Sequence, residues 1–184
     1  MRKLKNDELN RKTIQEFKRS EKIPLVIVLN NIRSLNNVGS IFRTADAFLV
    51  KCIYLCGITP HPPHREIQKT ALGATESVDW KHVQNCYETV VHLHKDGYEI
   101  ISVEQTDKSI ELQELSIDPN KKYALVFGNE IDGIEENILG KSDKIIELPQ
   151  YGTKHSLNVS VCVGIVLWDI IKKIKHPQSW SFQN

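Results

Sequence analysis

Two short, continuous apolar runs restrict what this chain can fold into. They span residues 24–29 and 123–127, and the second is β-branched and aromatic and stops at Gly128. A strand that is apolar along its whole length is typical of the interior of a parallel sheet, because helices then cover both of its faces. The two runs therefore predict strands in the core of an α/β fold.

Other strand-like and helix-like segments alternate with these runs. We expect further strands at residues 51–57, 100–103 and 145–148, and an edge strand at 78–83. Apolar stripes at helical spacing predict helices at residues 37–48, 87–95 and 156–175. Asn37 and Ser156 are the expected caps of the first and last helices, and Gly97 and Pro177 are expected to end the second and third. Residues 65–77 have a mixed pattern that predicts no element. The alternation predicts a mostly parallel sheet flanked by helices.

The length and the composition allow one domain. The chain has 184 residues, 40% of them apolar, which is enough for one substantial core and too few for two ordinary domains. Its net charge of +1 favours neither nucleic acid nor a membrane as a partner, but residues 1–22 hold eight Lys or Arg and four Asp or Glu, net +4. This basic segment is either a solvated helix or frayed end, or a segment that contacts phosphates.

The sequence carries no signal for a membrane, a disulfide or a metal. No run of about 18 apolar residues occurs and the N-terminus is charged, which predicts a cytoplasmic protein. The four cysteines lack CxxC spacing and lie in or near apolar segments, so we expect buried free thiols. Neither the pair His61 and His64 nor the pair His92 and His94 has the i, i+4 spacing of helical metal ligands, so we expect no metal.

Three segments that follow predicted strands are unusually polar. They are residues 30–46, 127–134 and 148–161, and each joins a buried strand to a helix through glycine, asparagine or hydroxyl side chains. Ligands of open α/β sheets bind outside the carboxyl ends of the strands, so we expect these segments to converge. None matches a P-loop or the GxGxxG fingerprint, which argues against nucleoside triphosphates and dinucleotides. The third leads into a helix start at Ser156 and Asn158, which can hold a polar ligand, although an ordinary capped core helix explains the same pattern.

Two charged residues in these segments are candidates for function. Arg43 lies off the apolar stripe of its helix and can point toward the strand ends, where a phosphate or carboxylate is the expected partner. The alternative is an ion pair with Asp46 on a solvated helix face. Glu130 can bond backbone N–H groups or position the arginine, or it is a plain loop carboxylate.

Taken together, the three segments resemble a known family. Residues 37–45, 127–133 and 156–161 are similar, in order and spacing, to the three motifs of the SpoU (TrmH) branch of the SPOUT RNA methyltransferases. Three separate motifs in the right order are far more specific than any one of them. The resemblance covers about residues 24–175, and it leaves residues 1–23 as a basic N-terminal arm and 176–184 as a C-terminal tail.

The resemblance implies a reaction, a cofactor and a site. Members of this family transfer the methyl group of S-adenosylmethionine to a ribose 2′-hydroxyl of tRNA or rRNA, without a metal, and their C-terminal segment forms a trefoil knot. Their cofactor is held mostly by main-chain atoms, which corresponds here to Phe127, Gly128, Leu148, Gly152 and Leu157. The implied catalytic group is Arg43 with Asn37, Glu130, Ser156 and Asn158 around it. An arginine with a pKa above about 12 is a poor base, so we assign Arg43 to the RNA phosphate and the developing oxyanion, and proton acceptance by Arg43 stays open.

The resemblance also implies partners. The family works as a homodimer whose active sites are completed by both chains, and the small residues Ser160 and Gly164 would permit close helix approach, although core packing explains them equally well. The arm and the C-terminal end are candidate RNA contacts, the latter through the cations and aromatic rings of Lys172, Lys173, Lys175, Trp180 and Phe182. We expect tRNA as the substrate, with rRNA or an inactive RNA-binding protein of the same fold as alternatives. A small-molecule α/β enzyme would need a nucleophile or an acid/base pair that the sequence does not offer.

Overall fold

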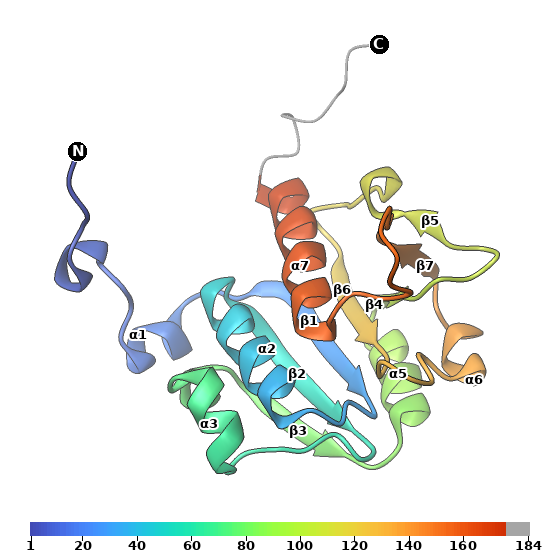
Figure 1. Ribbon diagram of the computed structural model, residues 1–184, viewed down its shortest axis with the longest axis horizontal. Helices are drawn as coiled ribbons and strands as arrows, with labels where there is room; N and C mark the ends of the chain where they lie inside the picture. The colour runs from blue at the N-terminus through green and yellow to red at the C-terminus, as the bar shows by residue number, and fades with distance from the viewer. Residues whose placement is uncertain (176–184) are drawn as a thin grey trace.

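The computed structural model describes residues 1–175, in which a parallel sheet lies between two layers of helices (Figure 1). The strands are β1 (Ile23–Asn30), β2 (Val50–Cys56), β3 (Trp80–Val83), β4 (Tyr98–Val103), β5 (Ile110–Glu111), β6 (Lys122–Phe127) and β7 (Lys144–Glu147). They lie in the order β3-β2-β1-β6-β4-β7-β5, and all neighbouring strands are parallel. The predicted strands and the edge position of β3 are confirmed, whereas the two-residue strand β5 was not predicted.

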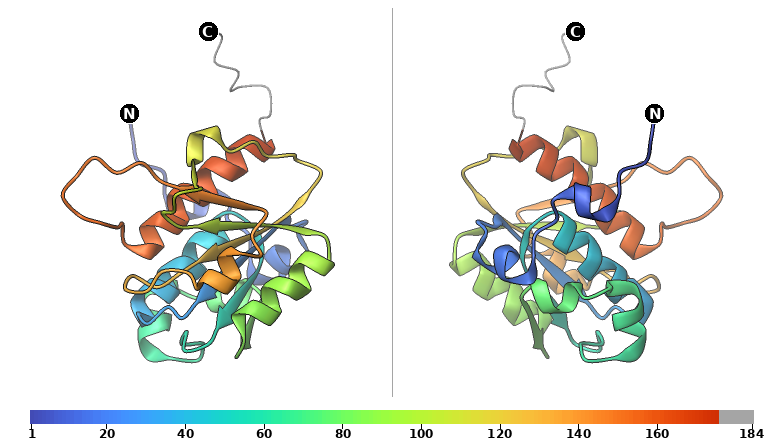
Figure 2. Two further views of the ribbon diagram at one scale, coloured as in Figure 1. Left: turned by 90° about the vertical axis from the view of Figure 1, so that its right-hand side faces the viewer. Right: turned by 90° about the vertical axis from the view of Figure 1, so that its left-hand side faces the viewer.

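Helices connect the strands and cover both faces of the sheet. After η1 (Asn6–Leu9) and α1 (Ile14–Arg19) come α2 (Leu35–Ala47), α3 (Arg65–Ala71), α4 (Ala74–Ser77), α5 (Cys86–Lys95), η2 (Leu112–Glu114), α6 (Glu136–Leu139) and α7 (Val159–Lys175). Helices α2, α3 and α7 lie on one face, and α5 and α6 lie on the other (Figures 1 and 2). In residues 1–175, no helix is both long enough and apolar enough to cross a membrane.

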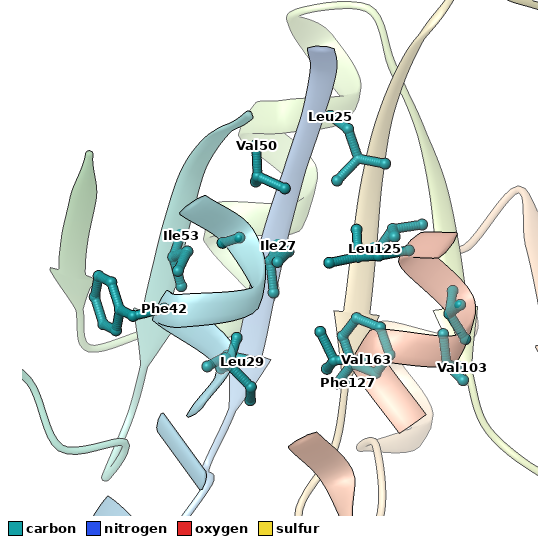
Figure 3. Packing of buried hydrophobic residues seen from close by; sticks show 14 of the residues in the cluster. Leu25, Ile27, Leu29, Phe42, Val50, Ile53, Val103, Leu125, Phe127 and Val163 are labelled. Carbon is teal, nitrogen blue, oxygen red and sulfur yellow. The ribbon is translucent and has the colours of Figure 1, made fainter. Parts of the chain in front are cut away.

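The interior strand β1 contributes to the core on both faces of the sheet. Leu25, Ile27 and Leu29 belong to the cluster under α2 and α7 (Figure 3). Val26 and Val28 belong to the cluster under α5. All five side chains are almost fully buried. Burial on both faces explains why polar side chains are absent from this run until Asn30, at the carboxyl end of the strand.

Both helix caps that the sequence predicts are wrong by two or three residues. Helix α2 begins at Leu35, and Ser34 is its cap because the Ser34 Oγ accepts a hydrogen bond from the Asn37 N–H at 3.3 Å. Helix α7 begins at Val159 after Asn158, whose Oδ1 accepts a hydrogen bond from the Ser160 N–H at 3.0 Å. Asn37 and Ser156 therefore do not cap these helices.

The other predictions concern residues 65–77, the end of α5 and the C-terminal tail. Residues 65–77, which gave no prediction, form the short helices α3 and α4. Gly97 adopts φ +82° directly after the cap of α5, as a helix-ending glycine does. Pro177, Trp180 and Phe182 lie outside the described residues.

Candidate active site

Three polar side chains from the three predicted segments form one hydrogen-bonded chain. Asn37 Nδ2, from the first turn of α2, donates to Glu130 Oε1 at 2.7 Å in the loop after β6. Asn158 Nδ2, at the start of α7, donates to Asn37 Oδ1 at 3.1 Å. Residues 93 and 121 positions apart in the sequence are therefore in direct contact, and the expected convergence of the segments is confirmed.

The two asparagines are held by the backbone as well as by each other. The Asn37 N–H is bonded by the Ser34 cap, and Asn158 accepts from the Ser160 N–H and Oγ, the latter at 2.6 Å. The Asn158 carbonyl also accepts from the Cys162 N–H at 2.9 Å. Both amides are thereby fixed in orientation at the starts of two helices, where the helix dipoles favour negative charge.

A hollow of about 450 Å³ lies beside this chain of side chains. The segments that follow β4, β6 and β7 form its walls, and the start of α7 closes one side. Of the predicted cofactor residues, Phe127, Gly128, Leu148 and Leu157 line it, and so do Glu130 and Ser156. Gly152 does not line it: it lies on the exposed loop between β7 and α7, which extends away from the body of the protein (Figure 2).

The wall after β6 requires glycine. A Cβ at Gly128 would lie 2.2 Å from the carbonyl carbon of Gly133, so the loop can close on itself only without a side chain there. Asn129 stabilises the same loop, since its Oδ1 accepts from the N–H groups of Ile131 and Asp132, each at 2.9 Å. The result is a narrow turn that presents main-chain atoms to the hollow.

Glu104 is a site residue that the sequence reasoning missed. Its Oε2 accepts from the Ile134 N–H at 3.0 Å and its Oε1 from the Gln105 N–H at 2.9 Å, and it lines the hollow. Glu104 thus ties the segment after β4 to the loop after β6. The available signal was its place directly after a predicted strand, the same signal that identified Glu130.

Arg43 does not join this group within one chain. The Arg43 side chain is exposed, has no hydrogen bond or ion pair with any residue between 1 and 175, and lines a second hollow with Arg11 and Lys12 of the arm. The alternative pairing with Asp46 is also wrong, because no ion pair joins Arg43 to Asp46 within residues 1–175; Asp46 instead accepts a hydrogen bond from the Ser77 hydroxyl. The expectation that Arg43 points toward the strand ends is therefore not met by a single copy.

The cysteines do not supply a nucleophile to the hollow. All four are free thiols, as expected, although Cys162 is only partly buried. Burial raises the pKa of Cys162, which lines the hollow, to about 12, and burial likewise raises the pKa of Cys52 to about 11. At neutral pH both are neutral thiols, and the thiolate is the reactive form. Within residues 1–175, no three His, Cys, Asp or Glu side chains are grouped so as to hold a metal ion.

Comparisons with known proteins agree on one family. The model of the SpoU rRNA Methylase family matches residues 24–168. A tRNA (guanosine(18)-2′-O)-methyltransferase of Aquifex aeolicus is 30% identical over 176 residues, which are 92% of this chain and 79% of that protein.

Solved structures show the same fold. The A. aeolicus TrmH/SpoU tRNA modifying enzyme superimposes with a TM-score of 0.76 at 26% identity, covering 89% of this chain and 82% of that one. The AdoMet-bound rRNA methyltransferase from Sinorhizobium meliloti superimposes with a TM-score of 0.73 at 23% identity, and the match spans 84% of this chain but 61% of that one. From the three converging segments and the match over residues 24–168, the chain belongs to the SpoU rRNA Methylase family.

Proposed function

We propose that this protein transfers the methyl group of S-adenosylmethionine to a ribose 2′-hydroxyl of RNA, and that its substrate is tRNA. The observation that carries the proposal is the hydrogen-bonded chain from Glu130 through Asn37 to Asn158, at the edge of a hollow of about 450 Å³. It unites all three motif segments beside a hollow of the size that binds cofactors.

The residues that line the hollow fit S-adenosylmethionine. Leu148 and Leu157 offer apolar surface for the adenine ring, and the glycine turn at Gly128 offers main-chain donors and acceptors. The carboxylates of Glu104 and Glu130 favour a ligand that carries a sulfonium and an ammonium group. The AdoMet-bound S. meliloti enzyme, which shares this fold, supports the same assignment.

The hydrogen-bonded side chains of Glu130, Asn37 and Asn158 would position the ribose. S-adenosylmethionine supplies an electrophilic methyl group, and in-line attack requires the 2′-oxygen to be held at a fixed place. Glu130 uses Oε1 for Asn37, which leaves Oε2 to accept a hydrogen bond from a ribose hydroxyl. Asn37 and Asn158 fix the direction of that carboxylate, and Arg43 stabilises the developing oxyanion and the adjacent phosphate.

We further propose that the enzyme is a homodimer through α7. Val161, Ile165 and Trp168 follow each other at helical spacing on one face and are 51%, 41% and 58% exposed. A Cβ at Gly164 would meet nothing within 4 Å, so packing within the chain does not require the glycine. Close approach of a second α7 accounts for both features, as such a face is costly to leave in water.

A dimer would also explain why Arg43 lies away from the candidate site of its own chain. Phe48, directly after α2, lies against Trp168 of α7 with ring centroids 6.2 Å apart, so α2 borders the apolar face of α7. A second copy docked on that face would bring its own α2, and with it Arg43, toward the loops of the first copy. We infer that Arg43 acts on RNA bound to the other protomer.

We propose the substrate class from the positive charge of the arm and Arg43 and from the names of similar proteins. The basic arm and Arg43 line one hollow, which suits a phosphate backbone. The Aquifex relative is named for tRNA and the Sinorhizobium structure for rRNA, so rRNA is the second candidate. We propose a cytoplasmic enzyme, which both RNA substrates would suit, and the trefoil knot of the C-terminal segment stays a prediction.

One labelling experiment tests this function. The protein is incubated with methyl-labelled S-adenosylmethionine and, separately, with unmodified tRNA and rRNA of the same organism, and the RNA is then hydrolysed in alkali. A 2′-O-methyl group blocks attack on the neighbouring phosphate, so we expect label in an alkali-resistant dinucleotide from the tRNA pool. The same product from rRNA alone would reassign the substrate. Label in mononucleotides would mean base methylation and would overturn the proposed chemistry.

A further inference from the structure

Asn30 is a buried amide without a partner. It is the last residue of β1 and is 1% exposed, and neither its Oδ1 nor its Nδ2 has a hydrogen-bond partner among residues 1–175. Buried side-chain amides are normally satisfied, because an unpaired donor or acceptor in a protein interior is costly. The neighbouring Asn31 shows the usual arrangement: its Oδ1 accepts from the Ile58 N–H and its Nδ2 donates to Glu135, both at 3.1 Å.

Asn30 lines a hollow that is separate from the cofactor hollow. This base hollow, as we call it, has a volume of about 370 Å³ and lies between the segment after β1 and the loop after β6. Asn129, Asp132 and Gly133 line both hollows, so one loop is the wall between them. A group bound in the base hollow would therefore sit one loop away from the methyl donor.

The chemistry of the base hollow excludes a phosphate and suits a nucleobase. Arg33 contributes one positive charge and Asp132 and Glu135 two negative charges, which leaves net −1. Arg33 is also paired with Asp132 at 3.3 Å. The rim residue Ile58 is 64% exposed and offers an apolar surface to an aromatic ring. An amide that presents one donor and one acceptor side by side is a group that reads a base edge.

We propose that the base hollow holds a nucleobase of the substrate RNA and that Asn30 reads its edge. Glu135 also lines the base hollow, where its Oε1 accepts from Asn31 Nδ2 at 3.1 Å, and its carboxylate favours a base with an exocyclic amino group, that is adenine, cytosine or guanine over uracil. The base belongs to the methylated nucleotide or to its direct neighbour. This inference rests on the proposed RNA methyltransferase function and adds a specificity-determining residue to it.

A titration tests binding without any need for catalysis. The side-chain amide signals of Asn30, assigned by loss in Asn30→Asp, are followed by nuclear magnetic resonance in the full-length ¹⁵N-labelled protein. Adenosine, cytidine, guanosine and uridine are the probes. We expect the Asn30 signals to move with the first three nucleosides and to move least with uridine. Signals that stay in place up to the solubility limit of all four would overturn the proposal.

A pair of variants separates base reading from a structural role. In Asn30→Leu the unpaired amide is replaced by an apolar group of similar size, so we expect an equal or higher Tm. Asn85→Leu is the control, because Asn85 caps α5 through the Glu88 N–H at 3.1 Å and lies outside both hollows. We expect a lower Tm and unchanged base preference for this control.

Base preference is measured as kcat/KM on the methylated RNA and on versions with uracil at the target or at either neighbour. We expect the wild type to disfavour uracil at one of these positions by about tenfold, and Asn30→Leu to lose that preference. The position that responds identifies the bound nucleotide. A lower Tm of Asn30→Leu with the preference intact would make the amide structural and overturn the inference. Failure of the wild type to methylate any ribose would instead refute the proposed function, while the nucleoside titration would still decide the role of Asn30.

Discussion

At the scale of single residues, the site depends on amides and carboxylates whose partners lie far away in the sequence. Asn37, Glu130 and Asn158 hold one another, and Glu104 holds the loop that carries Glu130. None of these four side chains contributes to the apolar core, so their arrangement serves the site. Arg43 differs from them, because in one copy it faces the arm.

The first prediction concerns Arg43. We expect Arg43→Ala to lower kcat/KM for RNA methylation by about 100-fold or more, because a guanidinium at a developing oxyanion is lost. The affinity for S-adenosylmethionine should stay the same, since Arg43 does not line the cofactor hollow. Calorimetric titration of cofactor and single-turnover kinetics measure the two quantities. Arg43→Lys, which keeps the charge and loses the planar fork, should recover only part of the rate. Cofactor binding that disappears together with activity would contradict this division of roles.

The second prediction concerns the glycine turn. A methyl group at Gly128 would clash with the Gly133 backbone at 2.2 Å, whereas at Gly152 it would meet nothing within 4 Å. We therefore expect Gly128→Ala to shift the loop after β6 and to weaken cofactor binding by about tenfold or more, at a stability cost of about 1–3 kcal/mol. Gly152→Ala is the matched control and should leave both the affinity and the Tm unchanged. Equal behaviour of the two variants in calorimetry would show that the turn does not shape the hollow.

At the scale of elements, the sequence predicted more of the strands than of the helix ends. Strands β1 and β6 are buried on both faces. Their continuous apolar runs therefore identify them without any information about tertiary contacts. Ser34 and Asn37 are both good cap residues three positions apart, and only the fold decides that Ser34 caps while the Asn37 amide turns to Glu130. Residues 65–77 fold as two short helices against α2, where Gly39 leaves room for Ile67 and Thr70.

The candidate site was predictable in composition but not in geometry. Asn37, Glu130 and Asn158 follow strand ends, which local sequence reveals. Arg43 also lies in a motif, yet the direction of its side chain depends on which face of α2 packs against the core. Asn30 could not be recognised, because a terminal strand asparagine reads as an ordinary turn residue until its burial is known.

The third prediction belongs to α7. Gly164→Leu should abolish the homodimer, since the added side chain occupies the space that we assign to the second α7. The monomer should remain folded, because leucine replaces glycine in a helix with a gain of about 0.8 kcal/mol in propensity. Sedimentation velocity gives the mass and thermal unfolding the stability. Lys95→Leu places the same side chain at an exposed position of α5 and should leave the mass unchanged. A Gly164→Leu protein that sediments like the wild type would refute the interface.

At the scale of the whole molecule, we expect the partly buried Cys162 thiol to make stability depend on pH in the alkaline range. Burial raises the pKa of Cys162 to about 12, above the ordinary 9.0 at which the unfolded chain releases the proton. Between these values the unfolded state binds fewer protons than the native state, so the free energy of unfolding falls as pH rises. The slope is about 1.4 kcal/mol per pH unit for each such thiol.

The fourth prediction follows from that slope. Denaturant unfolding between about pH 9 and pH 11 should show a smaller loss of stability per pH unit for Cys162→Ala than for the wild type. The difference should be close to the value for one thiol, and below pH 8 the two curves should run parallel. Identical slopes above pH 9 would mean that the Cys162 thiol ionises in the native state as it does in the unfolded chain.

The order of the strands also determines when the chain can fold. Val26 of β1 pairs with Ala124 of β6, so the centre of the sheet joins the two halves of the chain. Non-local pairings of this kind form slowly, and in a ribosome-bound chain that ends before Lys122 only β2 can pair with β1. Such nascent chains should expose the most apolar strand of the protein and bind holdase chaperones. We expect chaperone crosslinks to decline only after β6 has left the exit tunnel, which makes synthesis of the second half the event that releases the first.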